Sequence, residues 1–153
     1  MNPFNSLFLI LFFLSDVTPH ANLRTPTPRT GMAVGNGKKL VNILTYQDDN
    51  CGANIAGGSG DPGPQNAVVT YQEGETITVE WDTTISHPSD PGVRFAVAFA
   101  GEIFSDNILA SNLDAGGNGV HSTQVKLPSG KSGDAVLQFS WVSTADGGSY
   151  IGK

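Results

Sequence analysis

Three histidines are the residues of this chain best suited to chemistry: His20, His87 and His121. Taken singly, each is more often an ordinary loop or surface residue than a metal ligand. His20 stands apart because, if processing of the chain freed its α-amino group, that group and the imidazole would chelate a metal together. A loop imidazole would add a third nitrogen, and tetragonal nitrogen ligation is what Cu(II) prefers. We predict that His87 is this third ligand and that His121 is a surface residue.

The segment before His20 decides whether that amino group is freed. Residues 7–14 (LFLILFFL) are an apolar run of eight, too short to span a bilayer. The run is typical of a secretory signal peptide, so we expect residues 1–19 to be removed and the protein to be secreted. No basic residue precedes the run, and Pro19 is a poor residue before a cleavage site. A buried N-terminal strand or a wrongly assigned start is therefore the alternative, and cleavage after Ala21 would remove His20.

Two predicted strands and a stiff loop would position His87. Residues 76–81 alternate threonine and glutamate with isoleucine, valine and tryptophan, the period-2 pattern of a half-buried strand. Residues 93–99 alternate bulky apolar residues with an arginine and two alanines, which predicts a second strand. Pro88 and Pro91 interrupt both ladders because proline lacks a backbone N–H. His87 is therefore expected in a rigid loop between two strands.

The composition is that of one all-β domain. The 153 residues are 39% hydrophobic and include 19 glycines and 9 prolines, which suits many short strands joined by turns. We predict six or seven strands, a count that argues for a β-sandwich with Trp81 and Trp141 in its core. Besides the two strands above, we expect a strand at 41–46, an edge strand at 120–127 and a core strand at 135–143, with 102–113 mainly a surface loop containing one helical turn.

Charge and motifs exclude several functions. The net charge is −6, and Lys38 and Lys39 are the only basic pair that stands out, so we expect no nucleic-acid partner. Nucleophile elbows, phosphate loops and zinc-type spacings are missing from the sequence. Cys51 is the single cysteine, which is unusual for a secreted protein, where cysteines are normally paired.

Five segments together, in their order and spacing, resemble lytic polysaccharide monooxygenases and their type-4 chitin-binding relatives. The segments are HANLRTPTPR at 20–29, DNCGA at 49–53, GETITVEW with His87-Pro88 and GVRFAVAF between 74 and 99, EIFSDNILASNL at 102–113, and AVLQFSWVSTADGGSYIGK at 135–153. The resemblance implies an all-β, immunoglobulin-like (fibronectin III-like) β-sandwich with long loops. Residues 20–153 would form one copper-binding domain, truncated at its C-terminus, where Lys153 replaces the cysteine that would pair with Cys51.

The resemblance also implies the site and the activity. His20 would supply two nitrogens to one copper ion and His87 the third, with Tyr150 at the axial position and Gln138 as a weaker candidate for a polar group behind the ligands. The protein would be a secreted monomer that cleaves insoluble chitin- or cellulose-type polysaccharide oxidatively, using an external electron donor. The alternative is a non-catalytic copper-binding or carbohydrate-binding protein. A carboxylate at the axial position would favour copper handling, and Asp146 lies close enough in sequence to keep that possibility open.

Overall fold

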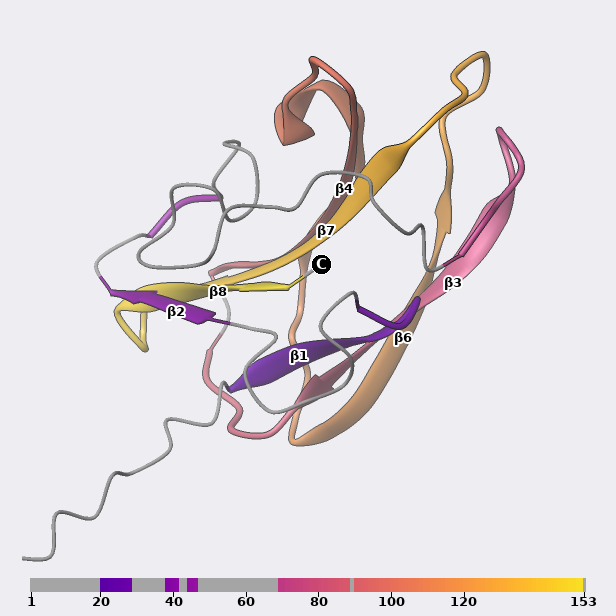
Figure 1. Cartoon of the computed structure of the whole chain (residues 1–153). Helices are drawn as coiled ribbons and strands as arrows, with labels where there is room; N and C mark the ends of the chain where they lie inside the picture. Colours follow the sequence, from indigo (N-terminus) through magenta and orange to yellow (C-terminus); the bar gives the residue numbers. More distant parts are fainter. Residues whose placement is uncertain (1–19, 29–37, 42–43, 47–68, 89, 153) are drawn as a thin grey trace, which may run out of the picture.

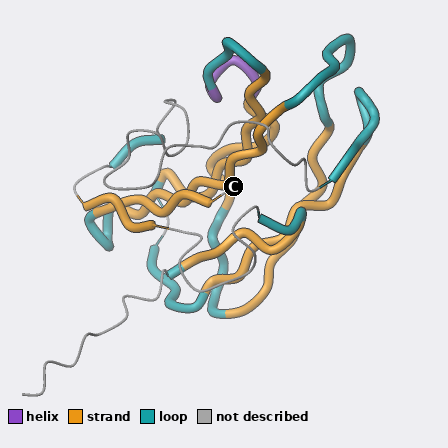
Figure 2. Tube along the Cα trace, viewed as in Figure 1, coloured by secondary structure: helices purple, strands orange, loops and turns teal. Residues whose placement is uncertain are grey.

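The computed structural model describes residues 20–28, 38–41, 44–46, 69–88 and 90–152. The apolar run at 7–14, Cys51 and Lys153 lie outside these residues, so the predictions made for them stay predictions. Within the described part the chain is an all-β sandwich, as the sequence predicts (Figure 1). Figure 2 shows that strands and loops account for nearly all of it, with a single short helical turn.

Eight strands in the described part form two antiparallel sheets. The smaller sheet has the order β1-β3-β6, and the larger has the order β2-β8-β7-β4-β5. The small sheet contains β1 (Ala21–Thr25), β3 (Thr76–Thr83) and β6 (Gly119–Lys126). The large sheet contains β2 (Lys38–Val41), β4 (Pro91–Phe99), β5 (Ile108–Leu113), β7 (Ala135–Ser143) and β8 (Gly148–Gly152).

The two strands predicted around His87 are confirmed, and they belong to different sheets. In β3 the apolar positions 77, 79 and 81 are buried while their neighbours are exposed or half-buried, because only one face of the small sheet meets the core. β4 is buried on both faces, since Phe95 lies in the core and Arg94, on the other face of the strand, lies against the ring of Tyr46. Pro91 is the first residue of β4, a place where a strand tolerates proline. The loop that carries His87 therefore crosses from one sheet to the other.

The core lies between the two sheets and is aromatic at its centre. The Trp81 ring of the small sheet lies 5.7 Å from the Phe95 ring of the large one, and Phe95 lies 5.6 Å from Phe139. Trp141 is fully buried beside them. The predicted core positions of both tryptophans are therefore confirmed. Offset or edge-to-face aromatic pairs of this kind add about 0.5–1.5 kcal/mol to the free energy of area burial.

Several boundaries differ from the sequence prediction. The strand expected at 41–46 is wrong, since β2 covers Lys38–Val41 and residues 44–46 are not in a strand. The helical turn within 102–113 is confirmed as the 3-10 turn η1 (Phe104–Asn107), but Ile108–Leu113 forms strand β5 instead of a loop. Polar residues fit β5 because it is the outer strand of its sheet. The edge strand β6 and the core strand β7 are confirmed.

Candidate metal centre

His20 is placed by the pairing of β1 with β3. Ala21 pairs with Thr83, so the residue before β1 meets the residues that follow β3. The carbonyl oxygen of His20 accepts hydrogen bonds from the backbone N–H groups of Thr84 and Ile85, at 2.9 and 3.4 Å. The histidine is thus bound directly to the beginning of the loop that carries His87.

His87 is held by hydrogen bonds of the residues on either side of it. The backbone N–H of Ser86 donates to the side-chain oxygen of Asn118 at 2.7 Å, and the Ser86 hydroxyl donates to the carbonyl of Gly116 at 2.8 Å. On the other side, the carbonyl of Pro88 accepts a hydrogen bond from the side-chain hydroxyl of Ser143 in β7. The His87 ring lies 6.3 Å from the buried Trp141 ring at an interplanar angle of 24°. The backbone on both sides of His87 is therefore held by these contacts.

The two histidines meet in space although they are 67 positions apart in sequence. Nδ1 of His20 lies 3.2 Å from Nε2 of His87, and the ring centroids are 5.1 Å apart. A carboxylate completes the group. The Oδ2 atom of Asp146 lies 3.5 Å from Nδ1 of His20, and its Oδ1 atom lies 3.6 Å from Nε2 of His87. The side chains of His20, His87 and Asp146 retain 19%, 28% and 11% exposure respectively, so the group is open to solvent at one side.

Asp146 lies in the turn between β7 and β8. The turn is closed by a hydrogen bond from the Gly147 N–H to the Thr144 carbonyl, at 3.2 Å. The Asp146 N–H donates to the Ser143 hydroxyl at 3.3 Å, which directs the start of the turn back toward the strand. Because β7 pairs with β4, this turn lies next to the end of the His87 loop. The carboxylate reaches the histidines through the sheet pairing and not through sequence proximity.

These ligand atoms fit a metal ion. The candidate donors of His20, His87 and Asp146 all lie within 4.8 Å of one another. Metal–nitrogen bonds are about 2.0 Å long, so two nitrogens on one ion lie roughly 2.8–4.0 Å apart at angles between a right angle and a straight line. The observed 3.2 Å is within that range. Nδ1 is also the ring nitrogen of His20 nearest its own backbone nitrogen, as a chelate with the α-amino group requires.

The structure places the other candidate residues elsewhere or leaves them undecided. Tyr150 lies in β8, where its backbone pairs with Trp141, but its side chain lies outside the described part, so its axial role stays a prediction. Gln138 is fully buried and accepts a hydrogen bond from Arg94 at 2.8 Å. Strand alternation puts Gln138 on the face of β7 opposite Trp141, so its role behind the ligands also stays a prediction.

The structure corrects in part the prediction that His121 is a surface residue. Its side chain is half-buried, with its ring 5.6 Å from Trp81 and its Nε2 atom 2.6 Å from the Gly117 carbonyl. The reason is pairing, since His121 lies directly opposite Trp81 in the sheet and shares its face. A side chain on Gly116 would overlap the imidazole, because its Cβ atom would clash with the ring of His121. His121 supports the 114–118 loop and is separate from the histidine–aspartate group.

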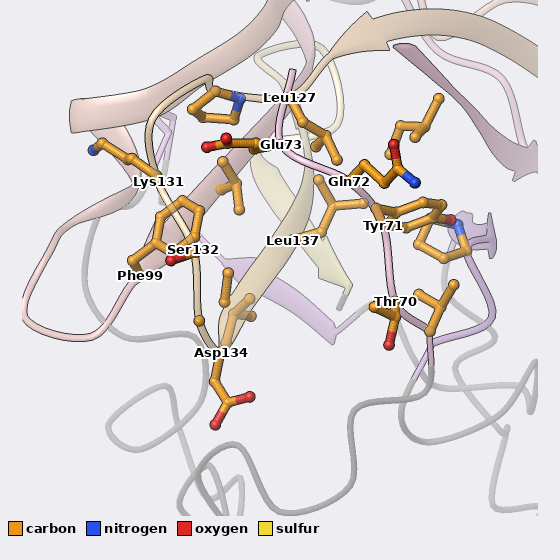
Figure 3. A pocket seen from close by; sticks show the side chains of 18 of the residues that line it. Thr70, Tyr71, Gln72, Glu73, Phe99, Leu127, Lys131, Ser132, Asp134 and Leu137 are labelled. Carbon is orange, nitrogen blue, oxygen red and sulfur yellow. The ribbon is translucent and has the colours of Figure 1, made fainter. Parts of the chain in front are cut away.

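A cavity of about 640 Å³ lies at the opposite end of the sandwich. Figure 3 shows Leu127, Leu137 and Tyr71 around it, with Lys131 and Asp134 among the polar residues. It lies where β3 begins and β4 ends, whereas His20 and His87 lie where β3 ends and β4 begins. Its walls are mainly apolar, and of its charged residues Glu73, Lys131 and Asp134, Lys131 is already bound to Glu102 and Asn107. The cavity has no counterpart to the convergent ligands of the histidine–aspartate group.

Fold and site together define an antiparallel β-sandwich with a group of two histidines and a carboxylate at one end, able to bind a metal. The chain belongs to the family of cellulose-degrading lytic polysaccharide mono-oxygenases, whose family pattern matches residues 33–152. The match includes His87 and Asp146 and begins after His20. Members of this family are copper enzymes that act on insoluble polysaccharide with an external electron donor, and they are typically secreted.

No significant match to this chain was found among curated protein sequences or among solved structures. Among the residues that the structure describes, no helix is long and apolar enough to cross a membrane.

Proposed function

We propose that this protein is a secreted, copper-dependent monooxygenase that cleaves cellulose- or chitin-type polysaccharide. One observation carries the proposal, the 3.2 Å approach of Nδ1 of His20 to Nε2 of His87. The histidine–aspartate group belongs to a chain of a copper-enzyme family and fits a metal by its donor distances. Removal of residues 1–19 would add the α-amino nitrogen of His20 and complete a three-nitrogen set.

In this proposal copper supplies the one-electron chemistry that lets O2 or peroxide abstract hydrogen from a glycosidic carbon. The chain's own residues hold the ligands in place beforehand. The loop hydrogen bonds of Ser86 fix the backbone next to His87, and the Trp141 ring lies along one face of its imidazole. Tyr150 is the proposed axial residue. The acidic net charge does not oppose binding, since cellulose and chitin are uncharged polymers.

Asp146 favours a second candidate, a non-catalytic copper-binding protein. Its carboxylate lies 3.5 and 3.6 Å from the two candidate histidine nitrogens. A carboxylate ligand would occupy a coordination position that an oxidative enzyme keeps open for its co-substrate, and its negative charge would favour the higher oxidation state of the metal. The same sandwich would then carry copper without oxidising a polymer.

The test begins with the mature N-terminus of the secreted protein, measured by intact mass and terminal sequencing. A chain that starts at His20 is then loaded with copper and incubated with cellulose and with chitin in the presence of ascorbate. The proposal expects oxidised oligosaccharides, and it expects H87A to release none. Tight copper binding without product on either polymer would support the copper-handling candidate. A mature chain that starts at Asn22 would remove the amino-terminal chelate and refute both.

The variant D146N separates the two candidates further. If the carboxylate is a copper ligand of a carrier, D146N lowers copper affinity and leaves the polymers uncleaved. If it lies beside an open position, D146N retains most of the affinity, and oxidised products still form.

A further inference from the structure

A single buried hydroxyl links two residues of the histidine–aspartate group. Ser143 is the last residue of β7 and is fully buried. Its hydroxyl donates to the carbonyl of Pro88 at 3.0 Å, next to His87 in the chain. The same oxygen accepts the backbone N–H of Asp146 at 3.3 Å. One oxygen atom therefore joins the loop of His87 to the turn of Asp146.

The backbone of Ser143 is itself a fixed point. It pairs with Pro91 at the start of β4 on one side and with Gly148 at the start of β8 on the other. A hydroxyl has one proton to donate and lone pairs to accept, and both are used here. Because the side chain is fully buried, water cannot take over its two contacts at low cost when it is removed.

We propose that Ser143 is a positioning residue, whose hydroxyl sets the separation between the His87 imidazole and the Asp146 carboxylate. The two groups lie 3.6 Å apart between Nε2 and Oδ1, and small shifts of either backbone would change this distance. The inference rests on the proposed function, in which His87 and Asp146 face one metal ion. The competing explanation is local, since a serine hydroxyl often accepts the N–H of the third residue after it simply to begin a turn.

The chain offers a matched control in Ser140, on the same strand. Ser140 is also fully buried, and in the part of the chain that the structure describes its hydroxyl has no hydrogen-bond partner. S140A therefore removes a buried β7 hydroxyl without removing either bond to the loop or the turn. S143T restores the hydroxyl at the critical position in a residue that strands accept.

The experiment compares the wild-type secreted protein with S143A, S143T and S140A. The first readout is made without metal, through the NMR signals of the His87 imidazole. The second is made with copper, through the electron paramagnetic resonance spectrum and the rate at which a chelator removes the metal. Mutation of residues that hydrogen-bond to metal ligands, without binding the metal themselves, changes metal affinity by about 10–100-fold. We expect S143A to move the imidazole signals, alter the copper spectrum and speed copper loss by about tenfold or more, with S140A and S143T close to wild type.

Each outcome decides the proposal. If S143A matches S140A in the metal-free signals and in copper loss, Ser143 only begins the turn. An S143A protein that loses its fold by circular dichroism, or a folded S143T that fails to restore the wild-type signals, would also overturn the positioning role. If the wild-type protein binds no copper, the proposed function fails by itself, and the metal-free signals still decide the role of Ser143.

Discussion

A shared hydrogen-bond acceptor beneath the His87 loop allows a quantitative test of the structure. The carbonyl oxygen of Ala115 accepts the indole N–H of Trp81 at 3.1 Å and the hydroxyl of Thr83 at 2.8 Å. Ala115 and Thr83 are fully buried and Trp81 is 4% exposed. These bonds tie β3 to the 114–118 loop, whose residues Gly116 and Asn118 in turn hold Ser86.

The expected effect of removing the donors is strongly non-additive. T83V keeps the side-chain shape and removes one donor, which should cost about 1 kcal/mol. W81F removes the other donor and some buried area, and should cost about 1–3 kcal/mol. Among the residues that the structure describes, either variant leaves the Ala115 carbonyl with one hydrogen-bond partner. The double variant leaves it buried with none, which adds a penalty of about 1–3 kcal/mol beyond the sum of the single effects.

The assay is equilibrium unfolding in urea of the wild type, the two single variants and the double variant. With slopes of about 1–3 kcal/mol per molar urea for a small protein, the extra penalty lowers the midpoint of the double variant by roughly 1 M more than additivity predicts. The control cycle pairs T83V with V97A, because Val97 lines the cavity at the other end of the sandwich. Additivity within about 0.5 kcal/mol in the Trp81–Thr83 cycle would refute the shared-acceptor argument.

Three further predictions concern other parts of the sandwich. The hydrogen bond from Lys131 holds the pKa of Glu102 below its usual value. The ionised Glu102 therefore stabilises the fold above its unfolded-state pKa, and this stabilisation is lost as pH falls through its folded-state pKa. K131M should show a weaker loss of stability on acidification, measured by urea midpoints against pH. Burial raises the pKa of Tyr46, so stability should fall as pH rises from its unfolded-state pKa through its folded-state pKa. Y46F should lack this alkaline loss of stability. A Tyr46 phenol that ionises at its usual pH, measured by ultraviolet absorbance, would contradict the prediction. L23A, in the strand that follows His20, should lower the free energy of unfolding by about 2–5 kcal/mol because Leu23 is only 1% exposed. The control I85A, at a position that is 44% exposed, should change the free energy of unfolding by about 0.5 kcal/mol or less.

The sequence is sufficient to predict the all-β class and the strands with clear alternation. Strands β3, β4 and β7 carry large apolar residues at every second position. This alternation follows from which face of a strand meets the core, so it can be recognised in the sequence whichever sheet the strand joins. The pairing of His20 with His87 is also predictable, from the chemistry of an N-terminal histidine, the stiff proline loop and a family resemblance. The 3.2 Å separation of their ring nitrogens agrees with that pairing.

Other features depend on tertiary contacts. β5 and β8 are polar or glycine-rich and become strands because neighbouring strands satisfy their backbone hydrogen bonds, a preference that local composition does not carry. In the sequence, Asp146 stands out only as a carboxylate near Tyr150. Its place beside both histidines follows from the pairing of β7 with β4, which brings the turn after one strand to the loop before the other. Sequence spacing specifies which residues are available, and the register between distant strands determines which of them meet.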